Sequence, residues 1–283
     1  MTAYRSWFIR CNGIKTHFVE AGSGDPVVLI HGGGPGACGE HNWQHNIPAL
    51  AERFHVFAVD LIGYGLSDKP PIEYSYEAKV NQIAGLVDTL CLDRLSIGGN
   101  SMGAYIAVRY ALDHPDRIDK VLMVATATVA NAMNIGTTTK RGATVRRSVG
   151  AEVTEETMRD WLSMLLYNKD RISDDLVRRR VAYGNLPGAI EAQQSYREHS
   201  ARIREDANLQ QWFDLSTRLP RATFPLALVW GKEDQFASPE LAAGLKAALP
   251  NLTEFHLVEG SGHQVQNDQP EKFNEIAVRF FGG

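Results

Sequence analysis

Residues 95–103, LSIGGNSMG, begin with a short apolar run. The run leads into Ser101, which has glycine two positions before it and two positions after it. The run predicts a buried strand, and apolar residues at helical spacing over 102–112 predict a helix that His114-Pro115 ends. A turn of this kind lifts its serine above the sheet edge in a strained backbone conformation, so the flanking positions must lack bulk. Ser101 is therefore the candidate nucleophile, and the alternative is a glycine-rich structural turn.

A serine hydroxyl reacts near neutral pH only when an imidazole takes its proton and a carboxylate orients that imidazole. Two later predicted strands supply such groups: 224–231 runs directly into Glu233 and Asp234, and 253–258 is followed by a loop with His263. Active residues gather at the carboxyl ends of strands in open α/β sheets. Spacing alone does not separate the two neighbouring acids.

A glycine-rich loop follows a third predicted strand. The apolar run 27–30 leads into HGGGPGA, residues 31–37, whose glycines let backbone N–H groups approach a ligand and face a developing oxyanion. A phosphate-binding loop is the alternative, but the Gly-Lys-Ser/Thr ending and the dinucleotide-binding glycine pattern are both missing. We expect His31 to support this loop rather than to titrate.

The composition of the chain argues against several classes of function. The chain has 283 residues, 44% of them hydrophobic, and a net charge of −4 with both signs interspersed, which predicts no face for nucleic acid. It has no apolar run long enough to span a membrane, and residues 1–5 do not read as the start of a signal peptide. Cys11, Cys38 and Cys91 lack metal-site spacing and indicate free thiols in the cytoplasm.

The order of the predicted elements indicates an α/β fold. A hairpin around Asn12-Gly13 precedes six strands that alternate with helices, which predicts a mostly parallel, doubly wound sheet. About a hundred residues without strand patterning interrupt this order, far more than a normal crossover needs. We assign residues 1–126 and 219–283 to an α/β core and 127–218 to an inserted helical lid.

The lid holds a candidate binding residue. Thr154 and Ser173 are predicted caps of two amphipathic helices, and Arg180 falls near the middle of the apolar arc of the second. A guanidinium on an inward face needs an anionic partner. The partner is either a protein carboxylate or a substrate carboxylate.

With these motifs the chain resembles the α/β-hydrolase fold family, and within it the meta-cleavage product hydrolases, which cut carbon–carbon bonds in ring-opened aromatic catabolites. The resemblance covers almost the whole chain. It includes the glycine loop followed by Asn42, Asn100 before the nucleophile, Arg180 in the lid and the loops of Asp234 and His263. The family order of serine, acid and histidine favours Asp234 over Glu233.

The resemblance implies cleavage of the C5–C6 bond of a 2-hydroxy-6-oxohexa-2,4-dienoate by a Ser101–His263–Asp234 triad, without metal or organic cofactor. It assigns the C6 oxyanion to the backbone N–H groups of Gly33 and Met102. The remaining substrate contacts that it implies are Gly34, Asn42, Asn100, Arg180 and Gln264. The implied partner is a small anionic molecule, and relatives often form dimers or larger homo-oligomers.

One departure from the family keeps alternatives open. Members commonly carry a large aromatic residue just after the catalytic histidine, where this chain has Gln264, with Gln266 close by. The change alters the shape and polarity of the site. A carboxylesterase, lactonase or thioesterase with the same triad is therefore the second hypothesis, and a non-catalytic receptor is the third. Epoxide and haloalkane hydrolysis are disfavoured, because those relatives use an aspartate where Ser101 stands.

Overall fold

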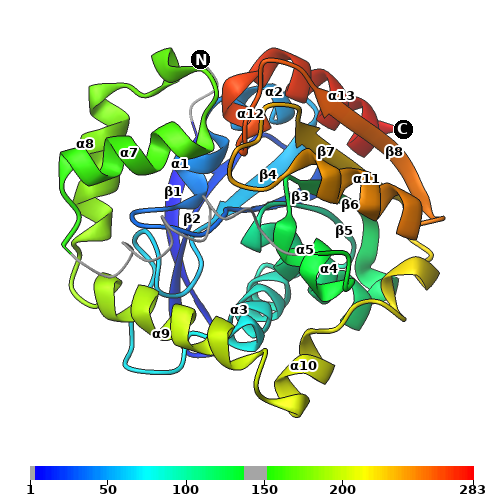
Figure 1. Ribbon diagram of the computed structural model, residues 1–283, viewed down its shortest axis with the longest axis horizontal. Coiled ribbons are helices and arrows are strands. Elements are labelled where there is room, and N and C mark those ends of the chain that lie inside the picture. Colours follow the sequence, from blue (N-terminus) through cyan, green and yellow to red (C-terminus); the bar gives the residue numbers. More distant parts are fainter. Residues whose placement is uncertain (1–3, 137–151) are drawn as a thin grey trace.

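Eight strands form one sheet in this computed structural model, which describes residues 4–136 and 152–283 (Figure 1). The strands are β1 (Arg5–Cys11), β2 (Ile14–Ala21), β3 (Asp25–Ile30), β4 (Phe54–Val59), β5 (Leu95–Asn100), β6 (Ile118–Val124), β7 (Leu226–Gly231) and β8 (Leu252–Val258). Their order across the sheet is β1-β2-β4-β3-β5-β6-β7-β8. The mostly parallel, doubly wound sheet is confirmed.

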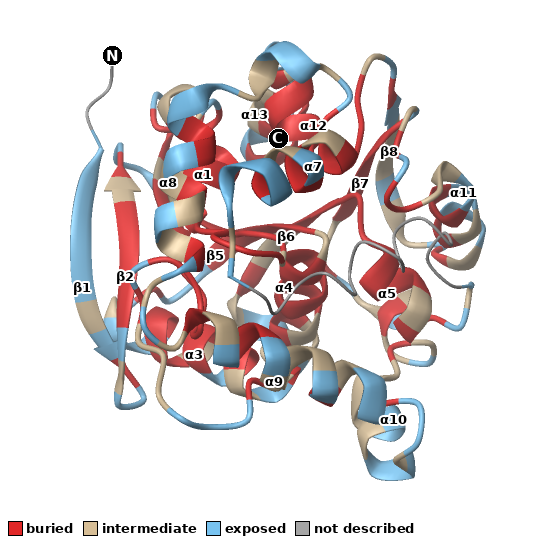
Figure 2. Ribbon diagram, turned by 60° about the vertical axis from the view of Figure 1, so that its left-hand side comes forward, coloured by how far each residue is buried: buried red, intermediate tan, exposed pale blue. Residues whose placement is uncertain are grey.

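The predicted N-terminal hairpin is also confirmed. β1 and β2 pair antiparallel with Cys11 opposite Ile14, and both turn residues, Asn12 and Gly13, have positive φ. β2 then pairs antiparallel with β4, while β3 to β8 pair in parallel. Figure 2 shows β1 as an exposed edge and the middle of the sheet as buried. Strands buried on both faces read as continuous apolar runs, which is why β3, β5 and β7 were readable in the sequence.

Helices cover both faces of the sheet: Figure 2 shows α13 on one side and α3 and α4 on the other. The helices around the core are α1 (Gly39–Trp43), α2 (Ile47–Leu50), α3 (Tyr76–Thr89), α4 (Met102–Asp113), α11 (Pro239–Ala248), α12 (Val265–Asp268) and α13 (Pro270–Gly282). Short 3₁₀ helices span Pro115–Arg117, Lys169–Arg171 and Leu219–Arg221.

The described residues between β6 and β7 are helical and contain no strand. Their helices are α5 (Ala127–Ala132), α7 (Glu155–Leu165), α8 (Asp174–Gly184), α9 (Ala189–Arg202) and α10 (Ala207–Phe213). Thr154 caps α7 by accepting a hydrogen bond from the Thr157 N–H, and Ser173 caps α8 in the same way from the Leu176 N–H. Both predicted caps are confirmed. The lid boundaries, 127 and 218, stay a prediction, and residues 1–3 and 137–151 lie outside the described part of the chain.

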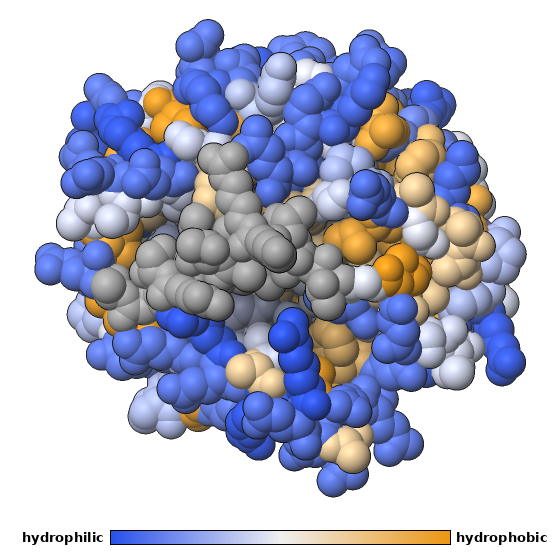
Figure 3. Space-filling view, in the orientation of Figure 1, coloured by the Kyte–Doolittle hydropathy of each residue, from blue (hydrophilic) through white to orange (hydrophobic). Residues whose placement is uncertain are grey.

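The face seen in Figure 3 is covered mainly by hydrophilic residues, with apolar residues in small separate groups. Within residues 4–136 and 152–283, no helix is long and apolar enough to cross a membrane.

Candidate active site

Ser101 lies on the turn between β5 and α4, with a φ of +55° that is rare for a residue with a side chain. A Cβ at Gly99 would lie 2.3 Å from the Gly103 carbonyl carbon, and one at Gly103 would lie 2.4 Å from the Ile30 carbonyl oxygen. Both flanking positions therefore require glycine. The Ser101 N–H donates to the Val124 carbonyl at 2.8 Å, which fastens the turn to the end of β6.

The imidazole of His263 is oriented by Asp234. Its Nδ1 lies 2.8 Å from Asp234 Oδ2, and both side chains are buried. The other carboxylate oxygen accepts hydrogen bonds from the N–H groups of Phe236 and Ala237, at 2.8 Å each. Glu233 instead accepts a hydrogen bond from the Ser261 N–H at 3.0 Å. The structure thus brings Asp234, and not its neighbour, to the histidine.

Ser101 and His263 line the same cavity, but no hydrogen bond joins them. His263 Nε2 is buried and has no hydrogen-bond partner among the described residues. Hydrogen bonds between catalytic groups are often long before substrate binds, and they tighten in the complex. The expected contact of all three groups is therefore only partly formed, because the His263–Asp234 pair is made and the Ser101–His263 pair is not.

The two residues expected to supply oxyanion donors, Gly33 and Met102, both belong to this region. Met102 is the first residue of α4, and the first N–H groups of a helix have no acceptor within it. The Gly33 N–H has no acceptor in the described part of the chain. Gly33 and Met102 both line the cavity with Ser101, so the donors required for an oxyanion are available there.

The amide side chains predicted to bind substrate form a buried network. Asn100 donates to the His263 carbonyl at 3.1 Å and accepts from Asn42 at 3.4 Å. Asn42 in turn accepts from Gln266 at 3.3 Å, and Asn267 donates to Gln264 Oε1 at 3.0 Å. Asn100, Gln264 and Gly34 line the cavity, whereas Asn42 is not among its lining residues. Asn100 thus holds the backbone of His263.

Arg180 lies on the inward face of α8, as predicted, with 2% of its surface exposed. Its guanidinium donates to the Pro35 carbonyl at 2.9 Å, its Nε has no partner, and it has no carboxylate partner among the described residues. Burial lowers its pKa to about 10. Arg180 contacts the glycine loop but is not among the residues that line the cavity. The structural ion pair that the sequence left open is not formed with any described residue.

His31 supports the glycine loop, as expected. Its Nε2 accepts a hydrogen bond from the Leu61 N–H at 3.0 Å, and its Nδ1 lies 2.7 Å from the Gly32 carbonyl oxygen. Complete burial lowers the pKa of His31 to about 4. Cys38 is buried beyond the loop, where its sulfur accepts a hydrogen bond from the His41 N–H.

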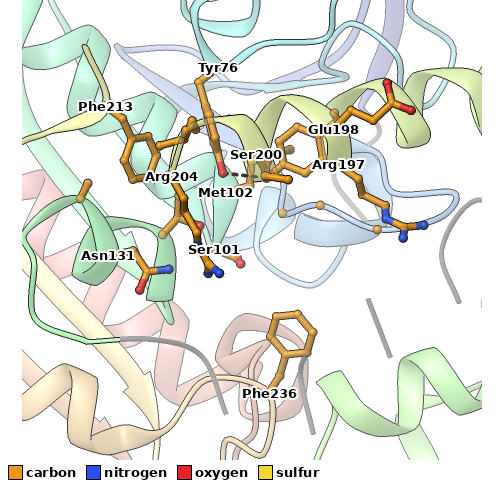
Figure 4. A pocket seen from close by; sticks show the side chains of 18 of the residues that line it. Tyr76, Ser101, Met102, Asn131, Arg197, Glu198, Ser200, Arg204, Phe213 and Phe236 are labelled. Carbon is orange, nitrogen blue, oxygen red and sulfur yellow. Dashed lines mark hydrogen bonds between the residues drawn. The ribbon is translucent and has the colours of Figure 1, made fainter. Parts of the chain in front are cut away.

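The cavity has a volume of about 1490 Å³. Its inner end is formed by residues 32–34, Ser101 and His263, and its outer wall by α5, α9 and the turn between α9 and α10 (Figure 4). Among the described residues, no group of three metal-binding side chains is arranged to hold an ion.

Hydrogen bonds hold α7 against the loop that carries His263. The sequence did not indicate these contacts. The carbonyl of Leu165 accepts hydrogen bonds from the N–H groups of His263 and Gln264, at 2.8 and 3.3 Å. Asp268 accepts from the N–H groups of Gly262 and Tyr167, at 2.8 and 2.9 Å, and also from that of residue 168. The only signal in the sequence was a carboxylate five residues after His263, and two of its three N–H partners lie 101 and 100 residues away.

A second serine, histidine and aspartate are hydrogen-bonded in the same order elsewhere. Ser6 Oγ lies 2.8 Å from His17 Nε2, and His17 Nδ1 lies 2.8 Å from Asp60 Oδ2. Ser6, however, is an exposed residue of the regular edge strand β1 and not part of a strand-to-helix turn. This group joins β1 to β2 and provides a matched control for Ser101.

A serine on a strand-to-helix turn, beside an aspartate and a histidine at the ends of later strands, defines a serine hydrolase of the α/β-hydrolase type. The family described as "alpha/beta hydrolase fold" matches residues 25–270. A 2-hydroxy-6-oxononadienedioate/2-hydroxy-6-oxononatrienedioate hydrolase of Pseudomonas putida is 30% identical over 94% of this chain and 91% of its own length. The chain belongs to the α/β-hydrolase family, and within it to the meta-cleavage product hydrolases.

Two further comparisons agree with this placement. A 2-hydroxy-6-oxo-6-(2'-aminophenyl)hexa-2,4-dienoic acid hydrolase of Metapseudomonas resinovorans is 27% identical over 99% of this chain and 91% of its own length. The solved structure of the meta-cleavage product hydrolase CumD of Pseudomonas fluorescens superposes with a TM-score of 0.81 at 28% identity, covering 98% of this chain and 97% of CumD. The hydrolases of Pseudomonas putida and Metapseudomonas resinovorans are named for substrates that differ at C6.

Proposed function

We propose that this protein hydrolyses the C5–C6 carbon–carbon bond of a 2-hydroxy-6-oxohexa-2,4-dienoate. The dienol first becomes its keto form, with His263 as the proton carrier, which creates an electron sink for the departing carbon. Water then adds to the C6 carbonyl, directly or after Ser101 has added there. The C5–C6 bond breaks, and its electron pair passes along the conjugated chain to the 2-oxygen, which takes a proton. The products are a 2-hydroxypenta-2,4-dienoate and a carboxylic acid.

The observation that carries this proposal is the His263–Asp234 pair, whose buried Nε2 is free to act in the cavity that holds Ser101. Gly33 and Met102 N–H groups would stabilise the C6 oxyanion, and the loss of one such donor typically costs ~10²- to 10³-fold in rate.

In the same proposal, Arg180, Asn42 and Asn100 hold the carboxylate and the 2-oxygen, with Gly34 and Gln264 beside them. The support for Arg180 is its burial against the glycine loop without an acidic partner in the described chain, because an incoming carboxylate would supply the missing charge.

The test is the loss of dienolate colour when purified protein meets a ring-fission product. Ser101→Ala and His263→Ala should each lower turnover by about 10⁴-fold or more, because the triad acts as a unit. Ser6→Ala, in the structural group of Ser6, His17 and Asp60, should retain wild-type turnover. A protein that binds the dienolate without cleaving it contradicts the proposal.

The second candidate is ester, lactone or thioester hydrolysis by the same triad. It is favoured by one observation, that Arg180 and Asn42 do not line the cavity. Rapid turnover of p-nitrophenyl esters without dienolate cleavage, unaffected by Arg180→Ala, would decide for it.

We also infer that the protein acts in the cytoplasm as a dimer or larger homo-oligomer on a small anionic substrate. The free thiols of Cys11, Cys38 and Cys91 support a reducing compartment. Light scattering on the purified protein measures the oligomeric state.

A further inference from the structure

The outer half of the cavity is lined by many polar side chains. They come from α5, from α9 and from the segment that follows α9: Thr128, Asn131, Gln193, Ser200, Gln210 and Gln211. Two of them leave a buried oxygen without a hydrogen-bond partner, because Asn131 Oδ1 and Ser200 Oγ contact no donor or acceptor in the described chain. Buried polar atoms without partners are costly, so this wall favours a ligand group that is itself polar.

Arg204 adds a positive charge to this wall. It follows α9 in the turn toward α10 and lines the cavity. Its guanidinium has no ion-pair partner among residues 4–136 and 152–283. Figure 4 shows its side chain running down toward the part of the cavity that contains Ser101, with the amide nitrogen of Asn131 turned to the same region. Two hydrogen-bond donors that face one space call for an acceptor between them.

The other charged residues of the lining do not neutralise Arg204. In Figure 4 the side chains of Arg197 and Glu198 both lie on the right-hand side of the view, away from Ser101. Asp214 lines the cavity too, but no ion pair joins it to Arg204 in the described part of the chain. The charge that Arg204 presents therefore remains available to a ligand.

We propose that Arg204, with Asn131, binds an anionic group at the end of the C6 substituent, so that the enzyme prefers substrates that carry a second carboxylate. The orientation rests on the proposed function, in which Arg180, Asn42 and Asn100 hold the carboxylate at the dienoate end. The C6 substituent then extends past Ser101 toward α5 and the α9–α10 turn. Arg204 is in this sense a specificity-determining residue.

The test compares two dienoates that differ only at C6, one with a 2-carboxyethyl group and one with the neutral 3-methylbutyl group of similar shape. Arg204→Met retains the apolar stem and removes the charge. It should lower kcat/KM for the carboxyethyl substrate by about 10- to 100-fold and leave the neutral substrate within about twofold. Arg197→Met, the matched control at the other arginine of the lining, should change neither.

Equal losses of kcat/KM on both substrates, no loss on either, or a wild-type preference for the neutral substrate would overturn the subsite. A second pair of substrates separates its failure from that of the proposed function. The p-nitrophenyl esters of succinate and 4-methylpentanoate carry the same two acyl groups and need only the triad. If the dienoates are not cleaved, an Arg204-dependent preference for the succinate ester still supports the subsite, and its absence rejects it.

Discussion

At the scale of single residues, chemistry depends on which of several similar side chains reaches the reacting atoms. Glu233 and Asp234 are adjacent in sequence and both follow β7, yet only Asp234 contacts His263. The same distinction applies to Ser101 and Ser6, because each belongs to a serine, histidine and aspartate group but only Ser101 has the strained turn and the nearby N–H donors. Backbone conformation and surroundings, and not the list of residue types, distinguish Ser101 from Ser6.

Substitution of Asp234 and of Glu233 should have different effects. Asp234→Asn should lower kcat by about 10⁴-fold, because an amide no longer holds the imidazole in its working tautomer or stabilises its charged form. Glu233→Gln should change kcat less than about tenfold, since its carboxylate serves a backbone N–H of the neighbouring loop. Steady-state kinetics on one substrate compares the pair. A larger loss from Glu233→Gln would reverse the assignment.

At the scale of elements, hydrogen bonds join the helix α7 to the loop that carries His263. Leu165 accepts from two N–H groups of that loop, and Asp268 bridges it to the chain after α7. Trp161 of α7 also packs edge-on against Phe236, whose ring lies 4.6 Å from the His263 ring between centroids. The position of α7 and the position of the imidazole are thus coupled.

Asp268→Asn tests this coupling. An amide offers one acceptor oxygen where the carboxylate offers two, so at least one of the backbone N–H groups that Asp268 now binds should lose its partner. We expect kcat to fall by about 10- to 100-fold with KM changed less, because a small displacement of His263 affects the transition state most. Asn274→Ala, on the next helix, is the comparison. An unchanged kcat in Asp268→Asn would show that the histidine loop is held independently of α7.

At the scale of the whole molecule, a buried cation lies between α3 of the core and α9 of the predicted lid. Lys79 of α3 is fully buried, donates to the Tyr74 carbonyl at 2.7 Å and lies over the ring of Tyr196 from α9. Burial lowers its pKa from 10.5 to about 7. Below about pH 7 the lysine is charged in both the folded and the unfolded states. Burial of that charge then destabilises the folded state.

The free energy of unfolding should therefore rise with pH above about pH 7. Between about pH 7 and 10.5 the unfolded chain binds a proton that the folded chain does not, which raises the free energy of unfolding by up to about 1.4 kcal/mol per pH unit. Lys79→Met should remove this contribution, whereas Lys246→Met, at an exposed position, should retain it. Urea denaturation at several pH values measures the slopes. Equal slopes in wild type and Lys79→Met would contradict the prediction.

Local patterns in the sequence sufficed for the strands, the hairpin, the helix caps and the nucleophile turn. Each depends on residues close in the chain: the glycines around Ser101 are required by the turn itself, and the apolar run 226–231 by burial on both faces. The inward position of Arg180 followed from helical spacing in the same way.

Only the tertiary structure decided which distant groups meet. It selected Asp234 over Glu233, linked Asn100 to the His263 backbone, fastened α7 to Asp268 and placed Arg204 on the cavity wall. These contacts join segments separated by up to 163 residues. Their geometry depends on how layers pack and not on local conformational preference, so one sequence determines the parts of the site while the packed fold determines their partners.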